Sequence, residues 1–425
     1  MTTASKAARQ AIYKSGALAA ITLSIIVGMN FDAKNVRANE AVNPVAKTAT
    51  TTAKPDAVSD TSKSTGSIVA RYHDGWQMFL QNPCRTSNAN LDPSVASKGK
   101  VKWTFPAEGP IDSSPAIYKG VIYVGSDDKN VYAIDEVSGR QIWRSGLGDK
   151  VRSSPAIADG VVVIGCEDKK IYGIDAKTGK QLWNYETADR VSSSAAIYEG
   201  VAYIGSWDGA MYALDVKTGA LKWRYAVPSN DPKEVVRITA SPCVGHNQII
   251  FACHNGNLYS LSIKDGTQLW QFRTGGKIYS SPMLIDNTVY FGSWDHAFYA
   301  VDVTTGKQRW KVGAPQSFSI AAASTGGKIF VGNDDLKMYC LDAASGRILW
   351  KTQLNSPVPL LSSSPAVSGN MLYCGSCDTN VYAIDTRNGA VKWKLKTQRA
   401  IISSPAIFSG GVCIGSQDGN LYCID

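Results

Sequence analysis

YGIDAKTGKQLW, residues 172–183, is one copy of the pattern Tyr-x-x-Asp-x-x-x-Gly-x-x-x-Trp, which recurs along this chain. The other complete copies are Tyr132–Trp143, Tyr212–Trp223, Tyr259–Trp270, Tyr299–Trp310, Tyr339–Trp350 and Tyr382–Trp393. In the copy that begins at Tyr259, Ser262 replaces the aspartate. Most neighbouring tryptophans lie 40 residues apart. That interval suits a repeat of four short strands joined by tight turns.

An eighth copy is divided between the two ends of the repeat region. Its first half is Tyr422-Cys-Ile-Asp425, and its Gly-x-x-x-Trp half is Gly99–Trp103. A ring of sheets needs its ends joined, and a sheet built from both ends of the chain does this. The sequence therefore predicts an all-β fold, an eight-bladed β-propeller of four-stranded antiparallel blades. An N-terminal strand is expected to pair with the C-terminal blade.

Four strands can be placed inside one repeat. Residues 153–157 should form the strand nearest the axis, because the small side chains of Ser-Ser-Pro-Ala suit the narrowest part of a ring. Residues 161–165 and 171–175 alternate like half-buried strands, and residues 181–183 begin the outermost strand. Glycine-ending turns, where positive φ is needed, separate them.

The repeat resembles a known family. The segment Ala133-x-Asp135-x-x-x-Gly139-x-x-x-Trp143 and its copies are similar to the tryptophan-docking motif of quinoprotein (PQQ) dehydrogenase propellers. The same motif is used by the outer-membrane β-barrel assembly factor and by exported PQQ-like proteins. Trp76-Gln-Met-Phe79 followed by Arg85-Thr86 is similar to the lead-in of such proteins. The resemblance covers residues 71–425 and implies fold more specifically than activity.

The resemblance also implies a structural role for the motif residues. Each tryptophan is expected to dock on the neighbouring blade, and each motif aspartate to accept backbone hydrogen bonds in its turn. The predicted docking residues are Trp103, Trp143, Trp183, Trp223, Trp270, Trp310, Trp350 and Trp393. A WD40 propeller is disfavoured, because Trp-Asp dipeptides occur in two repeats only and lie in turns.

The N-terminal region divides into three segments. Residues 1–38 are typical of a secretory signal peptide, with basic residues before an apolar stretch at 17–29 and a small-residue cleavage pattern ending at Ala38. An uncleaved membrane anchor is the alternative. Residues 39–68 are rich in Ala, Thr, Ser and Lys and are expected to form a flexible linker. The propeller region is 69–425, with a lead-in at 71–98.

These features predict export to the periplasm or the extracellular space. No cysteine precedes Cys84, so a lipid anchor on an N-terminal cysteine is not expected. We expect no transmembrane span in the mature chain, which is predicted to be a monomer. The formal net charge is +9, but removal of residues 1–38 leaves +5, and no run of like charge occurs. Nucleic acid is therefore not predicted as a partner.

One face of the ring varies more than the other. The connections between repeats and the turns between second and third strands should emerge together, and both insertions, at 226–238 and 352–361, fall in connections between repeats. The residue before each Ser-Ser-Pro element also varies: Asp112, Arg152, Ser192, Thr239, Tyr279, Ser319, Ser362 and Ile402. So does the third residue of the second turn: Asp127, Glu167, Trp207, His254, Trp294, Asp334, Cys377 and Gln417.

This diversity favours a binding face, although drift at exposed positions would produce it too. Basic residues near the channel mouth would suit an anionic ligand or an acidic partner segment. The candidate binding residues are Arg152, Arg190, Arg237, Lys277, Tyr279, Trp207, Trp294, His254, His296 and Arg399. The four histidines of the chain do not lie at ligand spacing, so no metal site is predicted.

An enzymatic role receives little support. In the quinoprotein family PQQ is held between a tryptophan and a disulfide of adjacent cysteines, beside Ca²⁺ and a catalytic aspartate. This chain has no adjacent cysteines and no CxxCH haem-attachment motif. The aspartates after Gly-Ser recur in nearly every repeat and are interpreted as turn-capping groups. No catalytic residue and no cofactor is predicted, with PQQ and Ca²⁺ as the alternative.

The nine cysteines are expected to be mainly small core residues. Cys413 and Cys423 should lie nearly opposite each other on a hairpin, where an oxidising compartment could join them. Cys374-x-x-Cys377 crosses a strand end and lacks the helix of a redox motif.

The first functional hypothesis is therefore an exported, non-catalytic module that binds a protein partner in the cell envelope. A PQQ-dependent dehydrogenase, another enzyme on the same scaffold such as a hydrolase, and a small-ligand sensor remain alternatives.

Overall fold

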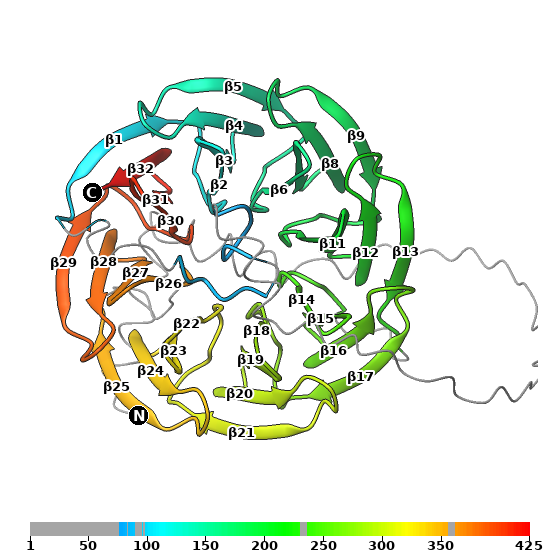
Figure 1. Ribbon diagram of the computed structural model, residues 1–425, viewed down its shortest axis with the longest axis vertical. Helices are drawn as coiled ribbons and strands as arrows, with labels where there is room; N and C mark the ends of the chain where they lie inside the picture. The colour runs from blue at the N-terminus through cyan, green and yellow to red at the C-terminus, as the bar shows by residue number, and fades with distance from the viewer. Residues whose placement is uncertain (1–75, 83, 90–95, 97, 230–235, 356–361) are drawn as a thin grey trace, which may run out of the picture. The chain divides into compact units, whose positions relative to one another are not determined.

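The computed structural model describes residues 76–82, 84–89, 96, 98–229, 236–355 and 362–425. The predicted signal peptide and linker lie outside these residues, as does the start of the lead-in. Within the described residues the strands form eight four-stranded antiparallel sheets around a central axis (Figure 1). The prediction of an eight-bladed propeller is confirmed. We number the blades 1 to 8 from the one that begins with β2.

Blades 1 to 7 run from an inner strand to an outer strand in chain order, and blade 8 takes its outermost strand from the start of the repeat region. The innermost strands are β2 Ala116–Tyr118, β6 Ala156–Ala158, β10 Ala196–Tyr198, β14 Cys243–Gly245, β18 Met283–Ile285, β22 Ala323–Thr325, β26 Ala366–Ser368 and β30 Ala406–Phe408. The second strands are β3 Val121–Gly125, β7 Val161–Gly165, β11 Val201–Gly205, β15 Gln248–Ala252, β19 Thr288–Gly292, β23 Lys328–Asn333, β27 Met371–Gly375 and β31 Gly411–Gly415.

The third and outermost strands complete the blades. The third strands are β4 Asn130–Asp135, β8 Lys170–Asp175, β12 Ala210–Asp215, β16 Asn257–Ser262, β20 Ala297–Asp302, β24 Lys337–Asp342, β28 Asn380–Asp385 and β32 Asn420–Ile424. The outermost strands are β5 Gln141–Gly146, β9 Gln181–Glu186, β13 Leu221–Ala226, β17 Gln268–Arg273, β21 Gln308–Gly313, β25 Ile348–Gln353, β29 Val391–Lys396 and β1 Val101–Pro106.

The ring closes through β1, as predicted. This strand pairs antiparallel with β32, so Trp103 faces Cys423 and Thr104 faces Tyr422. Blade 8 is therefore built from both ends of the repeat region. Figure 1 shows cyan β1 on the outside of the red C-terminal strands.

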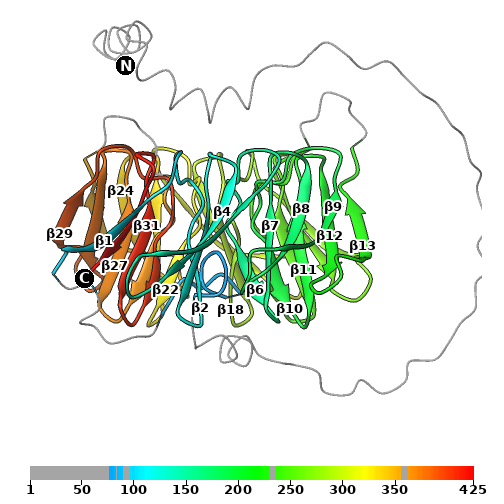
Figure 2. The ribbon, with the colours of Figure 1, turned by 90° about the horizontal axis from the view of Figure 1, so that it is seen from above.

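The core lies between neighbouring blades. The second strand β7 is buried along its whole length, whereas in β9 most residues are exposed and Trp183 is buried. Strands stand side by side around the axis, with turns at both faces of the disc (Figure 2). Because the strands of a blade are antiparallel, connections between blades and turns between second and third strands share one face, which we call the loop-rich face.

The inner strands are shorter than predicted. Strand β6 begins at Ala156, whereas we expected it to begin at residue 153. Pro155 has no N–H to donate to a ladder, and the hydroxyls of Ser153 and Ser154 accept from the N–H groups of Gly165 and Ser114. Ser154 lines the central channel.

The motif tryptophans all make the same contact. The Trp183 indole N–H donates to the carbonyl of Val216 in the next blade at 2.9 Å, and its ring lies against Gly219. A Cβ on Gly219 would meet the indole at 2.6 Å, and its φ is +71°, so only glycine suits this position. The indoles of Trp103, Trp143, Trp223, Trp270, Trp310, Trp350 and Trp393 likewise donate to backbone carbonyls.

The repeated aspartates stabilise turns, as the sequence predicted. Asp175 accepts from the backbone and the hydroxyl of Thr178, both at 2.7 Å. Asp168 accepts from the backbone N–H of Lys170 and from the hydroxyl of Tyr172, at 3.1 and 2.5 Å. Each aspartate therefore links its turn to the strand that follows it or precedes it.

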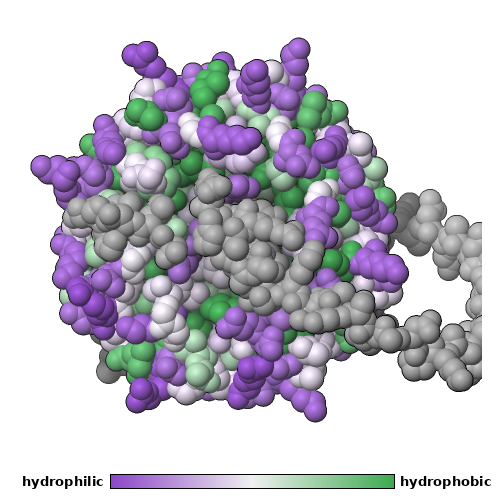
Figure 3. Space-filling model, viewed as in Figure 1, coloured by the Kyte–Doolittle hydropathy of each residue, from purple (hydrophilic) through white to green (hydrophobic). Residues whose placement is uncertain are grey.

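The surface in the view of Figure 3 mixes hydrophilic and hydrophobic side chains around the disc. Large exposed apolar residues are single side chains, such as Ile142 and Leu182 on outermost strands. Among the described residues no helix has the length and apolar character that crossing a bilayer requires.

Candidate functional site: a well on the loop-rich face

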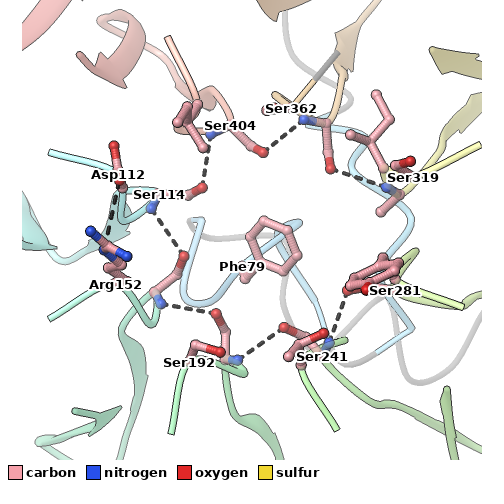
Figure 4. Close-up of a pocket in the computed structure, with 18 residues that line it drawn as sticks. Phe79, Asp112, Ser114, Arg152, Ser192, Ser241, Ser281, Ser319, Ser362 and Ser404 are labelled. Atoms are coloured by element: carbon pink, nitrogen blue, oxygen red, sulfur yellow. Dashed lines mark hydrogen bonds and ion pairs between the residues drawn. The ribbon is translucent and has the colours of Figure 1, made fainter. Parts of the chain in front are cut away.

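A cavity of about 280 Å³ occupies the channel where the inner strands begin. Its walls come from the two residue positions that lead into each inner strand, such as Ser192 and Ser194 of blade 3. Figure 4 looks into this well and shows serine side chains around it, with Phe79 at its centre. The well opens at the end of the blades where the connections between blades enter, which is the loop-rich face.

A chain of serine hydrogen bonds joins the blades around the well. The backbone N–H of Ser154 donates to the hydroxyl of Ser194 in the next blade at 2.9 Å, and six equivalent bonds follow the ring. They are Ser114 to Ser154, Ser194 to Ser241, Ser241 to Ser281, Ala321 to Ser364, Ser364 to Ser404 and Ser404 to Ser114. Ala321 has no hydroxyl, so the equivalent acceptor for Ser281 is missing. The wall is therefore polar, but most of its serine hydroxyls already accept a hydrogen bond from a neighbouring blade.

The lead-in segment closes the other end of the channel. Its carbonyls accept from the inner strands of five blades among the described residues, at 2.7 to 3.2 Å. The acceptors are Trp76 for β2, Gln77 for β6, Cys84 for β18, Thr86 for β22 and Ser87 for β26. We call residues 76–89 the plug. The channel is therefore a blind well rather than a pore.

Arg85 fixes the plug from within. It is fully buried, and its guanidinium donates to the carbonyls of Phe79, Pro242, Ser194 and Ala195, the last two at 3.0 Å. The guanidinium carbon also lies 5.5 Å from the centre of the Phe79 ring. Burial lowers the pKa of Arg85 to about 9. Arg85 thus holds Phe79 as the floor of the well.

The two variable positions singled out in the sequence meet at the rim of the well. Within blade 3 the indole N–H of Trp207 donates to the hydroxyl of Ser192 at 2.6 Å. Between blades, Trp294 donates to the hydroxyl of Ser319 at 3.1 Å. Corresponding pairs are His254 with Thr239, Ser319 with Asp334, and Gln417 with Asp112. The sixteen positions therefore form one collar.

Carboxylates gather on the rim at blades 1 and 2. Arg152 binds Asp127 through two bonds of 2.9 and 2.8 Å, and it lies 3.4 Å from Glu167 and 3.8 Å from Asp112. Burial, together with the charge of Asp127, raises the pKa of Asp112 to about 6. Arg152, predicted as a cation for an anionic ligand, is thus surrounded by the protein's own carboxylates.

Aromatic and basic residues gather on the rim at blades 3 to 5. The guanidinium carbons of Arg190 and Arg237 lie 5.1 and 4.8 Å from the centre of the Trp207 ring. His254, Tyr279 and Trp294 follow in contact, with ring centres 4.1 and 4.5 Å apart in turn. Burial and the charges of Lys277 and Arg237 lower the pKa of His254 to about 3, so this ring is neutral at pH 7.

Of the predicted binding residues, Arg152 and Tyr279 line the cavity, whereas His296 and Arg399 belong neither to its lining nor to the collar. His296 occupies the positive-φ position of its turn, at φ 68°, and is exposed. Arg399 is exposed at the connection into blade 8, where its carbonyl accepts from Thr397. Both are on the loop-rich face but outside the collar.

The plug and the serine ring were not predicted as parts of the site. The Ser-Ser repeats were visible in the sequence, but their bonds join residues about 40 positions apart in different blades. Phe79 and Arg85 lie in a segment that does not repeat, so no periodicity marks them. Lys150, which lies 3.2 Å from Asp127, was also missed.

The quinone cofactor implied by the resemblance does not fit the well. The Phe79 ring lies at its centre, and the carboxylate of Asp112 in its wall already forms an ion pair with Arg152 (Figure 4). The nine cysteines are buried, none of them forms a disulfide in the described structure, and no two are adjacent in the sequence. Cys413 and Cys423 do face each other across β31 and β32, but away from the well.

Two family models match the chain. The model described as outer membrane protein assembly factor BamB matches residues 90–312, which is just over half of the chain. The model described as the β-propeller of β-alanine-activating enzyme matches residues 229–425. No curated protein matches the chain significantly.

Several solved structures share the fold. BamB from Moraxella catarrhalis matches with a TM-score of 0.67 at 20% identity, covering 76% of this chain and 98% of that one. A europium-containing methanol dehydrogenase matches with a TM-score of 0.72 at 16% identity, covering 83% and 92%. Quinohemoprotein alcohol dehydrogenase from Comamonas testosteroni matches with a TM-score of 0.71 at 15% identity, covering 82% of this chain and 80% of that one. At these identities the likeness shows the fold alone.

Proposed function

The chain belongs to the family described as outer membrane protein assembly factor BamB, and on that premise we propose that it is a non-catalytic scaffold of the cell envelope. The proposal is that it binds a protein partner through its loop-rich face. It includes export of the chain to the periplasm or the extracellular space by a signal peptide at residues 1–38.

The observation that carries this proposal is the collar. No two blades have the same pair of residues at its two positions, whereas the serines below them and the tryptophans outside them repeat. Structural repetition requires no such diversity, because the same turn forms equally well with Asp127, Trp207 or Gln417 at its third position. A surface that recognises an asymmetric partner does require it.

The chemistry of the well favours binding over catalysis. The hydroxyls of the serine ring accept hydrogen bonds from neighbouring blades, and the described rim carboxylates near Arg152 are paired with it. His254 is buried against Tyr279 and bonds Thr239, so it lacks the exposed position of a general base. We find no observation that favours the dehydrogenase hypothesis over the scaffold.

Site-specific photo-crosslinking tests the proposal. A photoreactive phenylalanine analogue is placed at Ala188 or Gln398, which are exposed on the loop-rich face, and the chain is incubated with envelope extract. Matched positions on the opposite face are Lys264 and Lys307, exposed in turns between third and outermost strands. We expect protein adducts of defined mass from the first pair only.

Adducts from both faces alike, or from neither, would refute the scaffold proposal. A parallel assay with added PQQ and Ca²⁺ measures alcohol-dependent dye reduction. Turnover in that assay would show that the chain is an enzyme and would refute the scaffold proposal.

A further inference from the structure

We propose that the loop-rich face binds an acidic peptide segment of its partner, held by a basic and aromatic arc on blades 3 to 5. This inference rests on the proposed function for the existence of a partner, and it adds the chemistry of the segment that is recognised. We call the following residues the arc: Arg190, Trp207, Arg237, His254, Lys277 and Trp294.

Backbone hydrogen bonds show that the basic members occupy equivalent places. The carbonyl of Arg190 accepts from the N–H of Trp207 at 2.9 Å, that of Arg237 from His254 at 3.0 Å, and that of Lys277 from Trp294 at 2.9 Å. Three consecutive blades thus combine a cation with an aromatic ring at the same two positions. The repetition of this combination in adjacent blades creates a continuous surface.

The other blades fill these two positions differently. Blade 1 has Pro110 with Asp127, and blade 6 has Ser317 with Asp334. Blade 2 has Lys150 with Glu167, and the lysine is 3.2 Å from Asp127. The turn position is therefore acidic in blades 6, 1 and 2 and aromatic in blades 3, 4 and 5. Blades 7 and 8 have the uncharged residues Cys377 and Gln417 there.

The aromatic rings hold the cations and extend the contact surface. Arg190 and Arg237 both lie over the Trp207 ring, an arrangement that orients guanidinium groups. His254, Tyr279 and Trp294 contact one another in turn, with Tyr279 partly exposed at the wall of the well. Carboxylates of a ligand can meet the cations while its apolar atoms pack on the rings.

The acidic part of the rim determines on which side of the well an acidic ligand binds. Asp112, Asp127 and Glu167 lie around Arg152, so three carboxylates surround one guanidinium there. A carboxylate-rich segment is repelled from that side and attracted to the arc. An extended peptide fits this distribution, because it can follow the arc across three blades. A nucleic acid strand would also contact cations and rings, so the test includes one as a competing ligand.

The test measures peptide affinity by fluorescence anisotropy with the full chain. The probe is a fluorescein-labelled octapeptide of glutamate with one phenylalanine, compared with a lysine octapeptide and with single-stranded oligothymidylate. The main variant is Arg190→Glu with Arg237→Glu. The matched control is Lys264→Glu with Lys307→Glu, which makes the same change of net charge on the opposite face.

We expect the glutamate peptide to bind and the main variant to weaken it about 10- to 100-fold, while the control changes it less than about twofold. Arg190→Gln with Arg237→Gln should give a smaller loss of affinity. It replaces the main variant in the test if the main variant does not fold. Trp207→Ala should weaken binding as well. Higher salt should weaken it further.

Three results would overturn the inference. The first is no binding of the glutamate peptide, and the second is an equal loss of affinity in the main and control variants. The third is that the lysine peptide or oligothymidylate binds as tightly as the glutamate peptide. The scaffold proposal is judged separately by crosslinking. Crosslinks from the loop-rich face without peptide binding would leave the scaffold standing and remove the acidic segment. Peptide binding without crosslinks would refute the protein partner, and with it the inference, although the arc would still bind acidic peptides.

Discussion

Asp112 carries a buried carboxyl next to the carboxyl of Asp127, and Arg152 compensates them only in part. Its pKa of about 6 in the folded chain exceeds the usual value of 3.8. Between these values the folded state binds more protons than the unfolded state. Stability therefore decreases as the pH rises from about 4 to about 6, and the loss is complete above the folded pKa.

The variant Asp112→Asn removes this loss. Because two pKa units correspond to about 3 kcal/mol, we expect the variant to gain up to about 3 kcal/mol in unfolding free energy at pH 8 and little at pH 4. Urea denaturation at the two pH values measures this. Asp135→Asn is a control whose expected effect on stability at pH 8 has the opposite sign. Hydrogen bonds from Ser138 lower the pKa of Asp135, so its replacement should destabilise at pH 8.

At the residue scale the sequence identified the variable positions but not their contacts. Trp207 and Ser192 are 15 residues apart, and Trp294 and Ser319 are 25 apart, in adjacent blades. Such distances follow from ring geometry rather than from local pattern. For the same reason the neutralisation of Arg152 by residues of two other turns could not be foreseen.

At the scale of strands and turns, the contact between Trp183 and the next blade is the recurring link. We expect Trp183→Ala to cost about 3–5 kcal/mol, because a buried indole and one hydrogen bond are lost and Gly219 is uncovered. Leu182→Ala is the control, since that side chain is 50% exposed on the same strand. Chemical denaturation of both variants measures the difference. Equal losses would show that the indole has no docking role.

The order and number of strands were predictable because periodic tyrosines, glycines and tryptophans mark each blade. The start of the inner strands was less predictable. Ser153 and Ser154 have the small size expected near the axis, but their hydroxyls bond Gly165 and neighbouring blades instead of extending the ladder. Hydrogen bonds from backbone groups to side-chain hydroxyls compete here with those of the strand ladder, and no periodic pattern in the sequence marks this competition.

At the scale of the whole molecule, closure was predictable from the divided motif, whereas the plug was not. The plug reaches inner strands on opposite sides of the ring, such as β2 and β18, through backbone carbonyls that any sequence provides. Its side chains, such as those of Arg85 and Ser87, bond backbone carbonyls of the blades, and contacts of this kind have no sequence pattern. The blind well is therefore a property that appears only with the complete ring.

Two truncated chains separate the contributions of closure and plug. A chain that begins at Lys98 keeps β1 but loses the plug, whereas a chain that begins at Gly109 loses both. Without the plug, carbonyl acceptors for five inner strands disappear, and the channel opens at both faces. We expect that chain to stay folded with a lower Tm. Without β1, the edge of β32 is uncovered and Gly139 loses the Trp103 ring.

The second truncation should therefore lose cooperative unfolding, because blade 8 no longer covers blade 1 and the ring is open. Thermal melting followed by circular dichroism, together with the denaturant m-value, distinguishes the two chains. A sharp transition with an unchanged m-value for the chain that begins at Gly109 would contradict the role of β1 in closure. A Tm equal to that of the full chain after loss of residues 1–97 would show that the plug only fills the channel and does not hold the blades together.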